Sequence, residues 1–297
     1  MSGYINGANI SDIYHGNDYI ETVYKGNELI FDNSDILKKY LQGSSTFVIP
    51  KETTVMRKWC FCHYNTLKTV KFEEPCQLQE LPLYCFYGCT SLQSLMIPNS
   101  IKRIPDYMCM YCSSLSEVIF EEGFEFEQTN GLNHVFAECS TLENIILPDT
   151  TPPLGNGCFY GCSSLESINL PHSITSLGID CFCVCKSLQS IVIPNSVTSL
   201  GSECFYVCGS LSNVSFEEPC QIKELPQKCF GYCPIIEITI PSSITTIDTT
   251  TFVGCDQLTT IYVDKPTDSI SGAPWGAKNA TVIWSDNSHY PEKPQPY

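Results

Sequence analysis

The chain has 297 residues and a formal net charge of −16, from 32 acidic and 16 basic residues. Nucleic-acid affinity comes largely from clustered Lys and Arg, so we expect no nucleic-acid partner. No apolar run reaches bilayer-spanning length, and the N-terminus has neither the positive segment nor the apolar segment of a secretory signal. We therefore expect a soluble protein without membrane insertion.

Two similar phrases, ten residues apart at residues 13–20 and 23–30, mark the N-terminal segment. Each places apolar and aromatic residues on both sides of a Gly-Asn pair, a pattern typical of short strands joined by tight turns. We predict a small β-meander over residues 1–33, which is too small to be stable by itself and packs on the rest of the chain or on another subunit. This meander is our candidate attachment module and the place where a homo-oligomer would form. Its candidate attachment residues are Tyr14, Gly16, Tyr24 and Gly26.

A short helical pattern follows at residues 34–43. Ser34 is a suitable N-cap, an acidic residue comes next, lysines lie toward the end, and Gly43 ends the pattern. We predict a helix that caps the first coil of the repeats that follow, since the ends of a repeat stack need a cap.

From residue 44 onward the chain is a repeat protein. An aromatic residue recurs every 22 to 25 residues, and a cysteine almost always follows three residues later. One further copy, in which Cys109 takes the aromatic position, fits between Phe86 and Phe136. Such a period predicts a solenoid over residues 44–284, in which each coil buries its apolar face against its neighbours. The aromatic column consists of Phe61, Phe86, Phe136, Phe159, Phe182, Phe205, Phe230 and Phe252.

Residues 188–205 show the repeat most clearly. Apolar residues at alternate positions predict a buried strand, which Pro194 ends, and Phe205 then fills the convex side of the coil. Equivalent strands would stack into a parallel sheet, at residues 145–147, 168–170 and 191–193 among others.

Insertions and the C-terminal end depart from this pattern. Residues 72–81 and 216–225 carry the same insertion, and a longer acidic insertion at residues 121–128 interrupts the stack. Residues 273–284 are predicted to close the far end. The tail, residues 285–297, contains three prolines and should be flexible.

The 19 cysteines lie mostly in two columns, directly before the aromatic position and three residues after it. A small, easily buried thiol suits a tight turn, so we expect mostly reduced cysteines that fill the core, made in a reducing compartment. Disulfides between adjacent coils are the alternative, because equivalent residues there lie about 4.8 Å apart. The Cys-x-Cys pairs fall where the repeat places cysteine anyway, and the five histidines are scattered. We therefore expect no metal, no cofactor and no catalytic constellation.

A solenoid binds partners through outward residues of its strands. Here these are mainly small uncharged polar groups with scattered acids, which suit hydrogen bonding to a glycan or a protein and equally suit a surface that is merely soluble. The tyrosines after the aromatic column, Tyr87, Tyr160 and Tyr206, are a second candidate surface, although they also suit half-buried packing. The strand-face candidates are Gln93, Met96, Glu143, Asn144, Glu166, Asn169, Gln189, Asn213 and Tyr262.

Two runs, CFYGCSSL at residues 158–165 and IVIPNSVTSLG at residues 191–201, closely resemble the BspA-type leucine-rich repeat family. The likeness extends over residues 44–284, where the strand, proline, aromatic and cysteine columns stay in register. It implies a right-handed solenoid with parallel strands on one face, no catalysis, and adhesion to host proteins, glycans or other cells. The N-terminal phrases resemble short β-modules found at the ends of phage and prophage structural proteins.

These resemblances lead to a β-rich, non-enzymatic interaction protein. Our main prediction is a fibre-like phage virion component, assembled in the host cytoplasm, that binds a host surface or a neighbouring virion protein. The alternative is a cell-surface or secreted adhesin of a bacterium or anaerobic protist. An enzyme with its site in the insertion at residues 121–128 is a third hypothesis, which alanine substitutions of the glutamates in that insertion would test.

Overall fold

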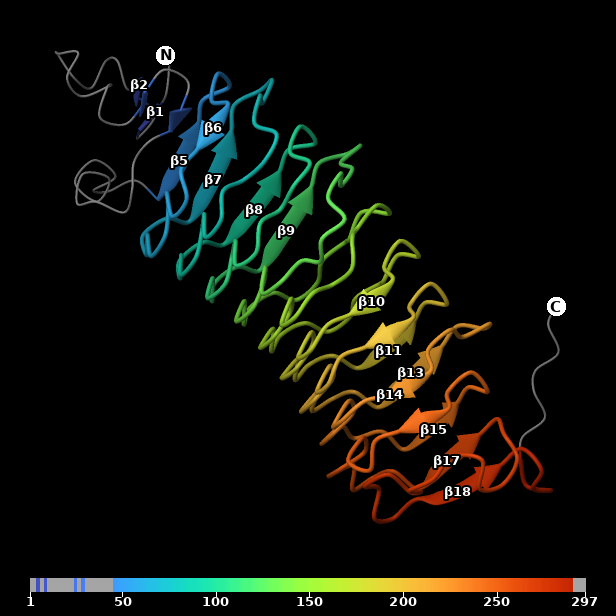
Figure 1. The fold of residues 1–297 in the computed structure, drawn as a ribbon. Coiled ribbons are helices and arrows are strands. Elements are labelled where there is room, and N and C mark those ends of the chain that lie inside the picture. Colours follow the sequence, from blue (N-terminus) through green and yellow to red (C-terminus); the bar gives the residue numbers. More distant parts are fainter. Residues whose placement is uncertain (1–3, 6–7, 10–23, 26–27, 30–44, 291–297) are drawn as a thin grey trace.

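The computed structural model describes residues 4–5, 8–9, 24–25, 28–29 and 45–290. The coils stack along one axis into an elongated body, with β5 near one end and β18 at the other (Figure 1). The fold is a β-rich solenoid, as predicted, and none of the described residues belongs to a helix. Accordingly, no helix in the described part of the chain is long and apolar enough to cross a membrane.

The strands fall into two rows that run along the stack. Strands of four residues form one side of the solenoid, which we call the long-strand face, and strands of two residues form the short-strand row. The long strands are β5 (Thr46–Ile49), β7 (Thr69–Phe72), β8 (Ser94–Ile97), β9 (Glu117–Phe120), β11 (Ser190–Ile193), β13 (Asn213–Phe216), β15 (Glu237–Ile240), β17 (Thr260–Val263) and β18 (Thr281–Trp284). The short strands are β6 (Val55–Met56), β10 (Ser176–Leu177), β12 (Ser199–Leu200), β14 (Glu224–Leu225) and β16 (Thr246–Ile247).

Pairing within the long-strand row is parallel and keeps equivalent residues opposite each other. Ile191 of β11 lies opposite Val214 of β13, and the same register relates β5, β7, β8 and β9 and relates β15, β17 and β18. Side chains alternate along each strand, so that Ile191 and Ile193 are buried while Val192 is exposed. A shift of one residue would expose the aliphatic set, and burial of that set therefore fixes the register.

The parallel row is interrupted where the sequence predicts strands at residues 145–147 and 168–170. The backbone N–H of Glu166 donates to the carbonyl of Glu143 (3.0 Å), which joins the starts of these segments. The residues that follow form no strand pairing, so this part of the prediction is wrong. The insertion at residues 121–128 lengthens the coil that leads from β9 to the first segment, and we attribute the loss of regular pairing to this longer coil.

Two N-terminal hairpins extend the two rows at the first coil. β1 (Tyr4–Ile5) pairs antiparallel with both β2 (Ala8–Asn9) and β5. β3 (Tyr24–Lys25) pairs antiparallel with β4 (Glu28–Leu29), and β4 pairs parallel with β6. The described backbone of the predicted meander thus adds strands to the solenoid. The predicted capping helix at residues 34–43 lies outside the described residues, as do Tyr14, Gly16 and Gly26.

Two tryptophans close the C-terminal end. The ring of Trp275 is fully buried, and its centroid lies 6.2 Å from that of Trp284 in an edge-to-face contact. Residues 285–290, which the sequence analysis assigns to a flexible tail, form turns directly after β18. The rest of that predicted tail, residues 291–297, lies outside the described residues.

A stack of phenylalanine rings runs through the centre of the solenoid. Phe182 is fully buried, and its ring centroid lies 5.3 Å from that of Phe159 and 5.4 Å from that of Phe205, with nearly parallel planes. The column continues beyond these three rings, and Cys109 is buried at the position where a ring is missing. The rings therefore line up from coil to coil, as predicted, and form a continuous buried part of the core.

A line of thiols runs beside the rings. The Cys185 thiol donates to the backbone carbonyl of Phe159, in the preceding coil, over an Sγ···O distance of 3.2 Å. That carbonyl also accepts from the backbone N–H of Cys162, so the thiol gives it a second hydrogen bond. Eight cysteines, one in each successive coil, repeat this contact at 2.9–3.2 Å. A thiol suits the position because it is small and mostly apolar and still supplies one hydrogen.

All 19 cysteines are free thiols, and all lie within the described residues. Burial raises the pKa of the Cys62 thiol to about 11 and that of the Cys183 thiol to about 12, which suppresses the reactive thiolate. Only Cys76 and Cys220, in the two matching insertions, are half-exposed.

Replacing Phe182 by Ala should lower the free energy of unfolding by about 3–5 kcal/mol, because it leaves a cavity between two stacked rings. The control is Val192→Ala, whose side chain is exposed and whose loss should change stability by less than about 0.5 kcal/mol. Urea denaturation followed by circular dichroism measures both. Equal effects of the two substitutions would contradict a core built on the ring column.

Thiol titration of the native protein near pH 8 should label Cys76 and Cys220 quickly and the 17 buried thiols only after denaturation. The physical reason is that burial blocks access of the reagent to the other thiols. In denaturant all 19 cysteines should titrate without a reductant. A lower total would show disulfides between coils.

Candidate interaction surface

The outward positions of the long strands form columns along the solenoid, because alternate residues of every strand point out of the sheet. The second outward residue of each coil defines what we call the central column. In chain order from β7 to β17, it contains Lys71, Met96, Ile119, Ile146, Asn169, Val192, Ser215, Thr239 and Tyr262. All of them are exposed except Tyr262, which is half-buried.

The candidate residues from the sequence lie on this face. Tyr262 packs its ring edge-to-face against Tyr290, with the centroids 6.1 Å apart. The others are exposed and are spread along the stack instead of gathering at one place. Those exposed candidates are Gln93, Met96, Glu143, Asn144, Glu166, Asn169, Gln189 and Asn213. Of the attachment candidates, Tyr24 belongs to β3, and only its backbone is described.

Three coils end their long strand in a phenylalanine followed by two glutamates, at residues 72–74, 120–122 and 216–218. The first glutamate reaches back to the turn of the preceding coil: Glu121 Oε2 accepts a hydrogen bond from the backbone N–H of Asn99 (2.8 Å). The same contact joins Glu73 to Lys51 and Glu217 to Asn195, each at 3.2 Å. The first glutamate therefore fixes the turn. The second glutamate is exposed, and in two of the turns it accepts a hydrogen bond from a backbone N–H two residues later: Glu74 from Cys76 (3.1 Å) and Glu218 from Cys220 (3.0 Å).

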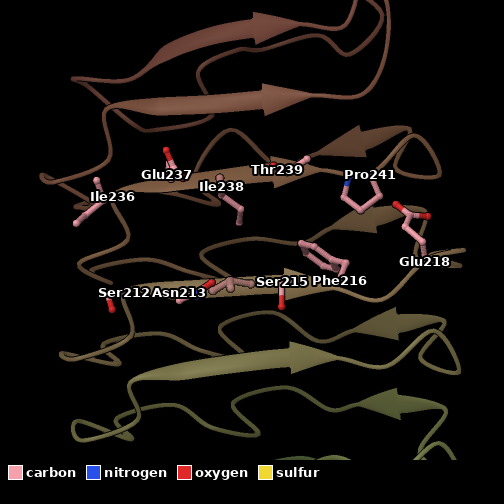
Figure 2. A pocket seen from close by; sticks show the side chains of 11 residues that line it. Ser212, Asn213, Ser215, Phe216, Glu218, Ile236, Glu237, Ile238, Thr239 and Pro241 are labelled. Carbon is pink, nitrogen blue, oxygen red and sulfur yellow. The ribbon is translucent and has the colours of Figure 1, made fainter. Parts of the chain in front are cut away.

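A hollow lies beside each Phe-Glu-Glu turn, on the side of the next coil. The hollow between β13 and β15 has a volume of about 520 Å³ (Figure 2). Phe216 and Pro241 approach each other at one end of it, where Glu218 also lies, and Ser215 and Thr239 lie along its strands. This hollow thus combines one half-buried ring with polar walls.

The other two hollows share a wall and form one surface, which we call the β7–β9 groove. Their volumes are about 350 Å³ and 320 Å³, and Glu117 and Ile119 line both. The sequence shows insertions at these Phe-Glu-Glu segments, but its pattern does not predict the hollows beside them. The remaining groove residues used below are Phe72, Glu74, Met96, Phe120, Glu121, Phe124 and Ile146.

The insertion at residues 121–128 is anchored by aromatic rings. Phe124 and Phe126 are buried and pack against each other and against Phe120, with ring centroids 4.8–5.8 Å apart. Glu125 and Glu127 alternate with these rings and are exposed. The acidic insertion is therefore not wholly exposed, since Phe124 and Phe126 belong to the core.

Aromatic residues also line the turns at the opposite end of the long strands. Tyr87, Tyr160 and Tyr206 are half-buried, which agrees with the packing role considered for them. A different set stacks face to face from coil to coil, and the sequence analysis missed it. Its successive centroid distances are 3.8, 5.1 and 5.0 Å, along Trp59, Tyr84, Tyr107 and His134.

The described residues contain no group of three or more His, Cys, Asp or Glu side chains arranged to hold a metal ion. His172 Nδ1 lies 3.5 Å from Glu217 Oε2, and both side chains are exposed to solvent. Such a pair on an open surface contributes little and suits no general acid–base role.

Solved structures of several bacterial proteins are similar to this chain. They include a leucine rich cell surface protein from Faecalibacterium prausnitzii A2-165, at 22% identity over 93% of this chain and 86% of that chain, with a TM-score of 0.45. A leucine-rich repeat protein from Bacteroides ovatus ATCC 8483 has 19% identity over 81% and 83%, with a TM-score of 0.47. The pneumococcal vaccine antigen PcpA has 16% identity over 82% and 69%, with a TM-score of 0.51, which shows a shared fold. No curated protein matches the sequence.

The sequence profile of the BspA type leucine rich repeat region matches six copies, over residues 39–132 and 129–259. The matched residues cover more than half of the chain and contain the ring stack, the thiol line and the β7–β9 groove. The match agrees with the parallel-strand solenoid described above. The chain therefore belongs to the BspA-type leucine-rich repeat family.

Proposed function

We propose that this protein is a non-enzymatic adhesin, displayed on or released from a cell surface, that binds another protein or a surface glycan through its long-strand face. The observation that carries the proposal is the row of exposed aliphatic side chains Met96, Ile119 and Ile146 in consecutive coils of a mostly polar sheet face. Large exposed apolar residues that lie together mark interaction surfaces. Membership of a family whose resemblance implies adhesion supports the same conclusion.

This proposal corresponds to the alternative of the sequence analysis and not to its main prediction. The virion prediction rests on the N-terminal phrases at residues 13–20 and 23–30, and the family match begins only at residue 39. A phage-like module is not shown by any comparison. Location at a cell surface therefore becomes the leading hypothesis, and attachment to a virion becomes the alternative.

A binding assay can test the role of the long-strand face. The full chain is presented to a panel of extracellular host proteins and glycans, and its affinity for any ligand is compared with that of two triple variants. The face variant should bind at least roughly tenfold more weakly, because bulky charges block the contact surface. The short-strand variant adds the same charge and should bind within about twofold of the native chain. The face variant carries Gln93→Arg, Asn144→Arg and Gln189→Arg, and the control carries Gln79→Arg, Ser199→Arg and Thr246→Arg.

Two outcomes would contradict the proposal. If both variants lose affinity equally, the long-strand face is not the binding surface. If the chain binds no member of the panel, the adhesin function is contradicted. Thermal unfolding of both variants checks that they remain folded, which the exposure of all six positions leads us to expect.

A further inference from the structure

Three aliphatic side chains occupy the central column in consecutive coils. The exposed fractions are 52% for Met96, 38% for Ile119 and 84% for Ile146. The same column is polar in the coils on either side, with Lys71 before them and Asn169 after them. The repeat itself therefore does not require an apolar residue at this position, and the cluster is a local feature of these coils.

The β7–β9 groove places aromatic rings below these side chains. Phe72 and Phe120 are half-buried at its edge, and buried Phe124 packs against Phe120 with the ring centroids 4.8 Å apart. The insertion at residues 121–128 thus supplies part of the groove floor. A floor of rings held by the core is rigid, which lowers the entropy lost when a ligand is bound.

Negative charge predominates around the groove, although the Lys71 side chain also lines it at β7. Glu74, Glu117 and Glu121 line it, and Glu143 and Glu166 follow on the same face. No lysine or arginine occupies an outward strand position between residues 93 and 169. Within the part of the chain that the structure describes, none of these five carboxylates forms an ion pair.

Apolar contact area combined with unpaired negative charge fits a basic ligand that also carries aliphatic groups. Neutral glycans are recognised largely through aromatic faces and planar amides, whereas the exposed centre of this groove is aliphatic. Anionic ligands and a second copy of this chain, with its net charge of −16, would be repelled.

We infer that the β7–β9 groove binds a protein segment in which lysine or arginine side chains flank large aliphatic side chains. The aliphatic groups pack against Met96, Ile119 and Ile146, and the cations lie beside Glu117 and its neighbours. This inference rests on the proposed function and narrows it to one part of the long-strand face and one class of partner.

The direct test uses a fluorescently labelled peptide of about 12 residues in which lysine and leucine alternate with serine, with the full protein as receptor. Fluorescence anisotropy measures the Kd. Matched peptides replace every lysine by glutamate or every leucine by serine, and both should bind at least roughly tenfold more weakly. Raising the salt concentration from about 0.15 M to about 0.5 M should also weaken binding of the lysine peptide, since screening reduces the electrostatic part.

Variants of the protein locate the site. Ile119→Ser combined with Ile146→Ser should weaken binding of the lysine peptide roughly tenfold, and Glu117→Gln should weaken it about threefold. The matched control combines Val192→Ser with Glu237→Gln, which makes the same kinds of change on the same face outside the groove. The control should stay within about twofold of the native Kd, and every altered side chain is exposed, so folding should be preserved.

Four results would overturn the inference: no binding of the lysine peptide, equal binding of the glutamate peptide, equal loss in the control variant, or tighter binding of a neutral glycan than of the lysine peptide. If the face variant of the preceding section loses a panel ligand while the lysine peptide fails to bind, the proposed function stands and this inference fails. If the face variant binds the panel ligand as tightly as the native chain does, both the proposed function and this inference fail.

Discussion

The structure depends on one constraint: each coil must hydrogen-bond to the backbone of the neighbouring coil and stack its ring on the ring of that coil. At the turns, the N–H of Phe182 donates to the carbonyl of Cys204 and that of Phe159 to the carbonyl of Cys181, both at 2.8 Å. The ring centroids of the same coils lie 5.3–5.4 Å apart, close to the spacing of hydrogen-bonded strands. Backbone pairing and ring stacking are thus compatible with a similar rise per coil.

The hydrogen bonding between coils also explains the unusual backbone conformation of the turns. Residues two positions before and after the ring have positive φ in most coils, for example 59° at Tyr84 and 63° at Val184. Non-glycine residues rarely adopt this conformation, and it costs roughly 1 kcal/mol or more at each position. The turn accepts the cost because its N–H groups must point at the next coil: the N–H of Val184 donates to the carbonyl of Tyr206 at 2.8 Å. Because the backbone and not the side chain sets this geometry, Trp59 and His134 can occupy the same type of position.

Prediction from sequence was strongest where one residue type has one physical reason to recur. The ring column could be predicted because a buried ring must meet an identical ring in the next coil. The interruption at residues 145–147 could not, since Ile145 and Leu147 alternate with an exposed residue in the same way as in the strands that do pair. The hollows were missed for a related reason: Phe120 and Glu121 are visible in the sequence, but the space beside them exists only once the next turn has been placed. Exposure of the candidate residues followed from strand alternation, whereas their importance for binding did not.

Hollows that form beside the same type of turn show which residues could determine ligand specificity in this solenoid. Both the hollow at residues 216–218 and the β7–β9 groove arise beside a Phe-Glu-Glu turn followed by a proline-ended strand. One exposes Ser215 on its central column, and the other exposes Ile119. The repeat therefore determines the position of a cavity, and a few outward side chains determine its chemistry. Since these side chains make no contact with the ring stack, they can change without loss of the fold, and one solenoid can present different surfaces along its length.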